Sequence, residues 1–119
     1  MKLPADIERR CLELAGAAAP ALAETISEKE FQAAVVALAH DNAWHTYHTF
    51  DSRKSQAGFP DLCLVRERVV WMELKAADGR LSAAQLNWRD WLVAAGAEVY
   101  VFRPADWPEI VALLTARAG

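Results

Sequence analysis

The sequence has few of the features that build zinc sites, disulfides or membrane spans. Only two cysteines occur in 119 residues, Cys11 and Cys63, and they share no Cys-x-x-Cys spacing; this argues against a zinc site and for two free thiols. No apolar run approaches the roughly 18 residues of a membrane span. The apolar stretch 15–23 follows acidic residues and is interrupted by Gly16 and Pro20, which is atypical of a signal peptide. We therefore expect an intracellular, cytoplasmic protein.

Glycine and proline are also scarce, with five of each, and no internal repeat is present. Hydrophobic residues make up 54% of the chain and charged residues 24%, which is the composition of an ordinary globular domain. Together with the length, this predicts one domain over residues 1–119. Within it we expect an N-terminal helical extension over residues 1–26 and a core over residues 27–115.

Positive charge is limited as well. The formal net charge is −3, which argues mildly against a nucleic-acid partner. The charge is uneven, because residues 1–52 carry four Lys and Arg against eight Asp and Glu, whereas residues 53–103 carry eight against six. Bound cations would reverse the local effect of carboxylates. A DNA partner is therefore compatible with this charge, with weak affinity in the absence of metal.

The hydrophobic pattern predicts a mixed α/β domain. Apolar residues at helical spacing predict four helices, which would cover residues 4–18 and begin near residues 27, 82 and 104. Runs rich in aromatic and β-branched residues predict four strands, over residues 43–50, 62–65, 69–74 and 99–102. The order helix, helix, three strands, helix, strand, helix favours a mixed sheet flanked by helices.

Two helix starts carry a capping-box pattern, Ser27 with Glu30 and Ser82 with Gln85. In the helix after Ser82, the expected inward stripe consists of Ala84, Trp88, Trp91, Leu92 and Ala95. The tryptophans suggest base stacking, but Trp88 and Trp91 are better explained as core. The remaining expectations are that Trp44 and Trp71 are buried and that Trp107 is the most exposed.

An acid and a base two residues apart on a strand form the centre of the predicted site. Glu73 and Lys75 share one face of the strand, among apolar neighbours where charges are costly unless paired or metal-bound. A three-residue hairpin loop, 66–68, would place Asp61 opposite Glu73. A two-residue loop would place Asp61 opposite Leu74, on the wrong face. The site hypothesis therefore requires the odd loop length.

Two carboxylates and a lysine suit hydrolysis of a phosphodiester bond. The oxygens of Asp61 and Glu73 favour Mg²⁺ or Mn²⁺, which would stabilise charge on the phosphate and lower the pKa of a water. Lys75 would orient that water and neutralise charge in the transition state. The carbonyl of Leu74 is a further candidate ligand. The simpler alternative, a structural ion pair between Glu73 and Lys75, is weakened by Asp61 in register.

Pro60-Asp61 and Glu73-Leu74-Lys75 form the signature of the PD-(D/E)xK nuclease superfamily, which the chain resembles. Within it, the chain is similar to the VRR-NUC family of replication and repair nucleases. The likeness covers roughly residues 28–114 and includes the segments 58–62, 79–82 and 96–101. The resemblance implies a restriction-endonuclease-like core (α-βββ-α-β) with an extra N-terminal helix. It also implies metal-dependent DNA cleavage, with Asp61 and Glu73 as ligands and Lys75 as the catalytic lysine.

The resemblance implies two further site residues. Glu30 corresponds to the acidic residue of the helix before the sheet, which contacts a metal or a water on it. Gln85 corresponds to a glutamine near the active site. For both residues a capping role is the alternative interpretation, and both roles can hold.

Small stand-alone members of the family resemble phage or prophage proteins, which are often homodimers that cut branched DNA such as four-way (Holliday) junctions. We therefore expect branched DNA as the partner, in replication, repair or recombination, and a homodimer. No membrane and no small-molecule cofactor is expected.

Basic residues near the motif are candidates for phosphate contacts. Arg53 and Lys54, in the loop before Pro-Asp, and Arg80 would fix the position of DNA rather than read its sequence, unless they are simply solvated. His45 and His48 lie three apart on a predicted strand and so point to opposite faces. His48 is the better candidate of the two for the side of the sheet that carries the active site, but a strand histidine that is merely hydrogen-bonded is the favoured interpretation.

Two other functions remain open. A non-catalytic DNA-binding subunit of a larger repair or phage complex would need no buried charges. A structural oligomerisation protein that uses the N-terminal helix would bind no metal. A divalent-metal titration of DNA cleavage separates these alternatives from a nuclease.

Overall fold

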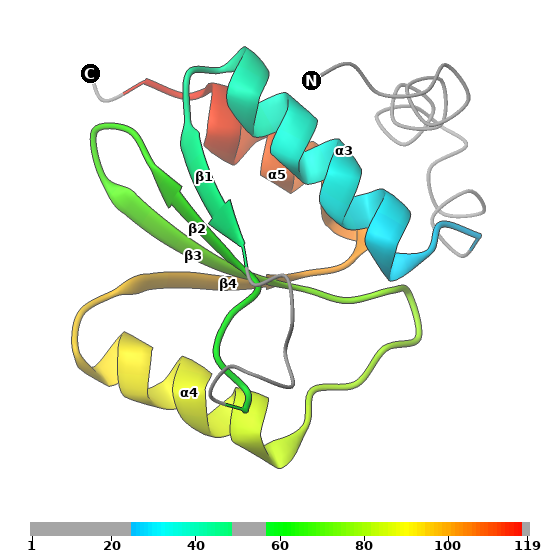
Figure 1. Ribbon diagram of the computed structural model, residues 1–119, viewed down its shortest axis with the longest axis vertical. Coiled ribbons are helices and arrows are strands. Elements are labelled where there is room, and N and C mark those ends of the chain that lie inside the picture. The colour runs from blue at the N-terminus through cyan, green and yellow to red at the C-terminus, as the bar shows by residue number, and fades with distance from the viewer. Residues whose placement is uncertain (1–24, 49–56, 118–119) are drawn as a thin grey trace.

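The computed structural model describes residues 25–48 and 57–117, and its elements are labelled in Figure 1. They are α3 (Glu28–Asp41), β1 (His45–His48), β2 (Leu62–Val65), β3 (Val69–Leu74), α4 (Ala83–Ala94), β4 (Glu98–Phe102), the 3₁₀ turn η1 (Pro104–Asp106) and α5 (Trp107–Thr115). This confirms the α-βββ-α-β order of the core. The helix expected over residues 4–18 lies outside the described ranges.

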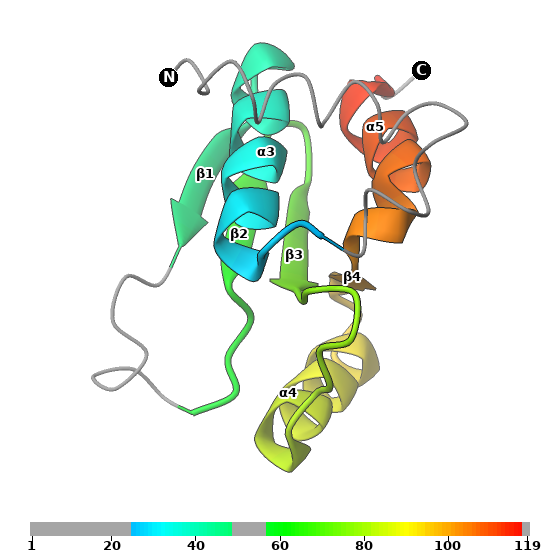
Figure 2. The ribbon, with the colours of Figure 1, turned by 90° about the vertical axis from the view of Figure 1, so that its right-hand side faces the viewer.

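The four strands form one mixed sheet in the order β1-β2-β3-β4. β1, β2 and β3 are antiparallel neighbours, whereas β3 and β4 run parallel. A parallel pair needs a long crossover connection, and α4 provides it. Helices α3 and α5 lie on one side of the sheet and α4 lies on the other (Figures 1 and 2). No helix in the described ranges is long and apolar enough to cross a membrane.

The β2–β3 hairpin confirms the register that the site requires. Val65 lies opposite Val69, so the loop consists of the three residues 66–68. Continuing this register one residue beyond β2 brings Asp61 opposite Glu73. The predicted three-residue loop is therefore confirmed, and both carboxylates lie on one face of the sheet.

The core lies between the sheet and the pair of helices α3 and α5. Alternate residues of β2 and β3 point into it, as the period of two in a strand requires. Its fully buried side chains include Phe31, Val35, Leu62, Leu64, Val70, Met72, Leu74, Ile110 and Leu114. The other face of the same strands carries Cys63, a half-buried free thiol, and Glu73. One face of the sheet therefore stabilises the fold, and the other face is available for chemistry.

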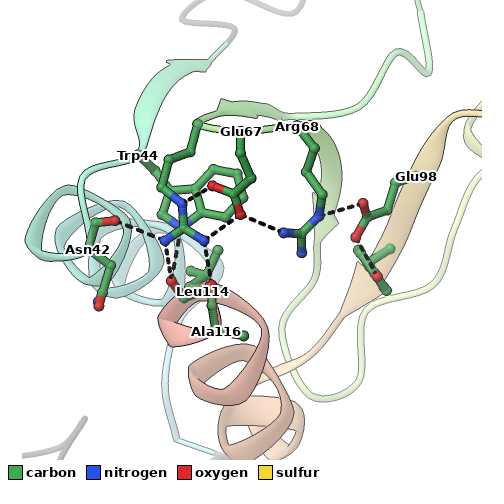
Figure 3. Close-up of polar contacts among 9 residues, drawn as sticks. Asn42, Trp44, Glu67, Arg68, Glu98, Leu114 and Ala116 are labelled. Atoms are coloured by element: carbon green, nitrogen blue, oxygen red, sulfur yellow. Dashed lines mark hydrogen bonds and ion pairs between the residues drawn. The ribbon is translucent and has the colours of Figure 1, made fainter. Parts of the chain in front are cut away.

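The hairpin loop 66–68 connects three parts of the chain at the end of the sheet far from Glu73 (Figure 3). Arg66 donates hydrogen bonds to the carbonyl oxygens of Asn42 and Leu114, at 3.1 and 3.2 Å. Its guanidinium group lies 4.3 Å from the ring centroid of Trp44, and Glu67 accepts from it at 2.7 Å. These contacts join the ends of α3 and α5 to the hairpin.

Both predicted capping boxes are present. Ser27 and Glu30 exchange hydrogen bonds of 3.1 Å each at the start of α3. At the start of α4, the Ser82 N–H donates to Gln85 Oε1 at 2.8 Å and the Gln85 N–H donates to Ser82 Oγ at 3.1 Å. Local sequence therefore fixes where both helices begin.

Helix α4 differs from the prediction of an inward apolar stripe. None of its residues is buried, and Trp91 is 59% exposed. The expectation that Trp91 belongs to the core is therefore wrong, and Trp88 is only half-buried. The reason is that α4 is the only described helix on its side of the sheet. It packs against the sheet on one flank, and no described element covers it from outside.

The burial of the other tryptophans agrees with the prediction for only one of the three. Trp44 is buried, as predicted, and its Nε1–H donates to the carbonyl oxygen of Leu114 at 2.9 Å. Trp71 is only half-buried, because it lies on the sheet face that α4 partly covers. The prediction that Trp107 is exposed is wrong. Trp107 begins α5 and packs into the core between the sheet and the helices α3 and α5.

Candidate active site

Asp61 and Glu73 are held together by a crossed pair of hydrogen bonds. The Asp61 N–H donates to Glu73 Oε2 at 3.1 Å, and the Leu74 N–H donates to Asp61 Oδ2 at 3.1 Å. Each carboxylate thus accepts from the backbone of the opposite strand, just past the β2–β3 ladder. The antiparallel pairing of β2 and β3 therefore fixes the distance between the two side chains.

The two carboxylates are poorly compensated by positive charge. Glu73 is 4% exposed and is the one buried charged side chain among the described residues. The nearest cation is Lys75, whose Nζ lies 4.0 Å from Glu73 Oε1, at the outer limit of an ion pair. Burial raises the pKa of Asp61. Burial, and next the charge of Asp61, raise the pKa of Glu73 to about 8.

This donor set fits a hard divalent cation. Two carboxylates packed together favour either a shared proton or a bound cation, and carboxylate oxygens are the ligands that Mg²⁺ and Mn²⁺ prefer. No third His, Cys, Asp or Glu of the described ranges gathers with Asp61 and Glu73. The remaining ligands of a cation would therefore be water, substrate oxygens or a backbone carbonyl, for which Leu74 stays a prediction.

Gln85 connects helix α4 to the carboxylates. Its Nε2 donates to Glu73 Oε1 at 2.6 Å, while its Oε1 accepts from the Ser82 N–H. Because the amide oxygen is engaged in the capping box, the amide nitrogen faces Glu73. One side chain thus caps α4 and contacts Glu73, and a role of Gln85 in catalysis stays a prediction.

A close backbone approach, which the sequence did not reveal, holds the Asp61 loop against α4. Gly58 has a φ of +87°, and a Cβ added there would lie 2.4 Å from the carbonyl carbon of Ala84. The next residue, Phe59, packs edge-to-face against Trp71 and Trp88, with ring centroids 5.2 and 5.0 Å apart. Gly58-Phe59 is therefore the contact that positions the loop before Asp61 relative to Gln85.

A second contact that the sequence did not reveal lies behind Lys75. Arg103, just after β4, donates to the carbonyl oxygen of Gly79 at 2.7 Å. A Cβ added at Gly79 would lie 3.2 Å from the Cβ of Lys75. The loop after β3 therefore packs on the aliphatic part of the lysine. An arginine just after a strand does not indicate, from the sequence alone, that it will bind the loop behind Lys75.

Glu30 and His48 are not brought into the carboxylate cluster. The capping role of Glu30 is realised, but Glu30 does not join Asp61 and Glu73 as a third acidic group. A contact through a water on the metal stays a prediction. His48 pairs with Leu62 and so lies on the core face of the sheet. The expectation that it faces the same side as Glu73 is wrong, because the face follows from the register.

Of the three basic residues predicted to contact phosphates, only Arg80 lies among the described residues. Arg80 is exposed in the segment between β3 and α4, and its phosphate contact stays a prediction. Arg53 and Lys54 lie outside the described residues, as does Cys11.

The family comparison agrees with the motif. A family model described as the VRR-NUC domain matches residues 4–106. No curated protein and no solved structure matches the chain. The match begins at residue 4, whereas the resemblance drawn from the motifs began near residue 28. Leaving the first 25 residues outside the likeness was therefore wrong, because much of that segment is matched too.

Proposed function

The chain belongs to the VRR-NUC family of nuclease domains, and from this premise we propose that it is a Mg²⁺- or Mn²⁺-dependent endonuclease that hydrolyses DNA phosphodiester bonds. The observation that carries this proposal is the hydrogen-bonded pair of the half-buried Asp61 and the buried Glu73 beside Lys75. A domain that only binds DNA has no need to hold two carboxylates together, one of them buried, with a single lysine beside them.

The proposed reaction is the hydrolysis of one P–O bond. The oxygen of water bonds to phosphorus, the P–O bond to the departing oxygen breaks, and that oxygen receives a proton. A divalent cation, when bound, would neutralise charge on the phosphate and lower the pKa of the attacking water. Asp61 and Glu73 would hold the cation. Lys75 would orient the water and neutralise charge that develops on the phosphate, while Gln85 holds the Glu73 carboxylate in place.

The proposed substrate is branched DNA, such as a four-way junction, and the proposed assembly is a homodimer with two active sites. These proposals rest on the resemblance to small stand-alone members of the family. They fit a role in replication, repair or recombination, in the cytoplasm of a bacterial or phage-infected cell. Arg80 and the loop with Arg53 and Lys54 are the proposed phosphate contacts.

The test is cleavage of labelled four-way junction, flap and linear duplex DNA with Mg²⁺, Mn²⁺ or EDTA. Glu73→Gln and Glu109→Gln form a matched pair, because Glu109 is an exposed carboxylate on α5. We expect metal-dependent cutting of branched DNA that Glu109→Gln retains. Glu73→Gln should slow it by about 100-fold or more. Equal cutting of linear duplex would refute the branched preference alone. DNA binding without cleavage in either metal would favour the non-catalytic subunit.

A further inference from the structure

Lys75 is held in the proposed active site by only a weak polar contact. Within the described ranges its one ion pair joins Nζ to Glu73 Oε1 at 4.0 Å, although the side chain is only 14% exposed. A lysine ammonium group sits at the end of a long, flexible aliphatic stem, and an ion pair of this length does not fix such a stem. Packing against the stem therefore has to decide where the ammonium group lies.

The turn that ends at Gly79 provides this packing. The Gly79 N–H donates to the carbonyl oxygen of Ala76 at 3.0 Å, which closes the turn after β3. A Cβ added to Gly79 would lie 3.2 Å from the Cβ and 3.3 Å from the Cδ of Lys75. The backbone of Gly79 thus lies directly against the lysine stem. Any shift of this turn would change the room that the stem has.

Arg103 holds this turn from the side of β4. Its Nη2–H donates to the Gly79 carbonyl oxygen at 2.7 Å, where the loop after β3 passes the end of β4 (Figure 2). Continuing the β3–β4 register one residue beyond Leu74 and Phe102 brings Lys75 beside Arg103. The Lys75 N–H also donates to the Phe102 carbonyl oxygen at 3.0 Å. The end of β4 therefore holds both the backbone of Lys75 and the turn that packs on its side chain.

The backbone of Arg103 is itself fixed by the 3₁₀ turn η1. Its N–H donates to Asp106 Oδ2 at 2.8 Å, and its carbonyl oxygen accepts from the Asp106 N–H at 2.8 Å. In the described part of the chain the Arg103 side chain makes no ion pair, and it lies beside another cation, Lys75. Like charges repel, so the stability of the fold alone gives no reason for an arginine at this place.

We propose that Arg103 is a positioning residue of the active site, which holds the Lys75 ammonium group in place through the Gly79 carbonyl. Its effect on the reaction passes through Lys75, and it contacts neither DNA nor metal. Only the consequence for cleavage rests on the proposed nuclease function. Without the bond to Gly79 the turn loosens and the lysine stem can move. A misplacement of about 1 Å can slow an enzymatic reaction roughly 100-fold.

The position of Lys75 can be tested in the full chain without DNA or metal, by the rate at which its amine is methylated with formaldehyde and a borohydride. Lys29, exposed on α3, is the internal reference. Arg103→Met removes the donor to Gly79 and keeps an unbranched stem. Arg66→Met is the matched control, because it also removes an arginine that binds backbone carbonyls, at the far end of the sheet.

The methylation rate of Lys75, relative to that of Lys29, should rise about fivefold in Arg103→Met, which is the factor expected for one lost hydrogen bond. Arg66→Met should leave this ratio unchanged. An unchanged ratio in Arg103→Met, or an equal rise in both variants, would overturn the proposal.

Cleavage of branched DNA tests the consequence for the reaction. In Arg103→Met, kcat should fall at least about 10-fold while KM stays the same. In a Lys75→Met background the same substitution should cause no further loss, because its effect passes through the lysine. Gly79→Ala presses on the lysine stem without changing any charge, and it should slow cleavage as well. It serves as the test if circular dichroism shows that Arg103→Met has lost its fold.

The kinetic outcomes separate positioning from a direct role. A higher KM with unchanged kcat in Arg103→Met would show that Arg103 contacts DNA, and would overturn the proposal. A further loss in the Lys75→Met background, or cleavage by Gly79→Ala at the wild-type rate, would overturn it too. If the wild-type chain cuts no DNA while Arg103→Met still raises the methylation rate of Lys75, the nuclease is refuted and the positioning of Lys75 stands.

Discussion

At the scale of single residues, the carboxyl group of Glu73 decides how the metal-free protein responds to pH. Its pKa is raised to about 8, first by burial and then by the charge of Asp61. The folded state therefore holds this proton more tightly than the unfolded state does. The resulting stability is fully present below the ordinary pKa of about 4.5 and is lost as the pH rises through about 8.

The prediction is that, in EDTA, the free energy of unfolding falls between about pH 5 and pH 8.5. A loss on the order of 3 kcal/mol is expected from the size of the pKa change. Glu73→Gln removes the titrating group and should remove most of this fall. Urea unfolding at a series of pH values measures both proteins. Parallel curves for the two would show that Glu73 does not titrate in this range.

Gln85 is the residue whose two roles can be separated by substitution. Gln85→Ala removes the hydrogen bond to Glu73 Oε1, whereas Ser82→Ala weakens the same capping box and keeps that bond. Both variants should lose about 1 kcal/mol of stability. Only Gln85→Ala should weaken Mn²⁺ binding or cleavage, by about 10- to 100-fold, as expected for a residue that orients a metal ligand. Equal activity of the two variants would reduce Gln85 to a helix cap.

At the scale of elements, the site depends on α4 being held against the Asp61 loop. Gly58 and Gly96 have nearly the same positive φ, +87° and +88°, so an alanine should cost about 1 kcal/mol at either position. At Gly58 the added Cβ would also overlap the backbone of Ala84, whereas nothing lies within 4 Å at Gly96. Gly58→Ala should therefore be the more destabilising and should slow cleavage, with Gly96→Ala retaining it. Equal unfolding midpoints would contradict this close contact.

The hairpin loop 66–68 offers a second comparison between elements. Arg66 joins the hairpin to the carbonyls at the ends of α3 and α5, while Arg68 pairs with Glu98 at 2.8 Å on a half-exposed edge. Arg66→Met removes the side-chain donor to the Asn42 carbonyl and leaves the Leu114 carbonyl with the Trp44 Nε1–H alone. We expect its melting temperature to fall by roughly 5–10 °C, against a few degrees or less for Arg68→Met. The opposite order in a melting experiment would show that the edge pair matters more.

The elements also show what could be predicted from the sequence. The capping boxes and the hairpin register follow from local spacing, so the helix starts and the pairing of Asp61 with Glu73 were correct. The burial of a helix, in contrast, could not be predicted in this way. The pattern in α4 identifies an apolar flank, but local spacing does not show whether another element covers it. The same limit explains Trp107, whose burial depends on how α5 docks on the sheet beside α3.

At the scale of the whole molecule, the two faces of the sheet are used differently. The face under α3 and α5 carries the hydrophobic core, whereas the opposite face carries Glu73, which Gln85 of α4 contacts. Family and fold could be predicted, because the motif lies on regular, correctly paired strands. The contact of Gly58 with α4 and the position of Arg103 could not, since both depend on the final docking of segments far apart in the sequence.

The central claim is that Asp61, Glu73 and Lys75 form a metal-dependent phosphodiesterase site. In this site the carboxylates are proposed to bind the metal, and the lysine is proposed to act in the cleavage step. The most direct measurement compares Mn²⁺ binding by calorimetry with DNA cleavage for wild type, Asp61→Asn and Lys75→Met. We expect Asp61→Asn to lose both, and Lys75→Met to bind Mn²⁺ but to cleave at least about 100-fold more slowly. Cleavage by Lys75→Met at the wild-type rate, or Mn²⁺ binding that survives Asp61→Asn unchanged, would contradict it.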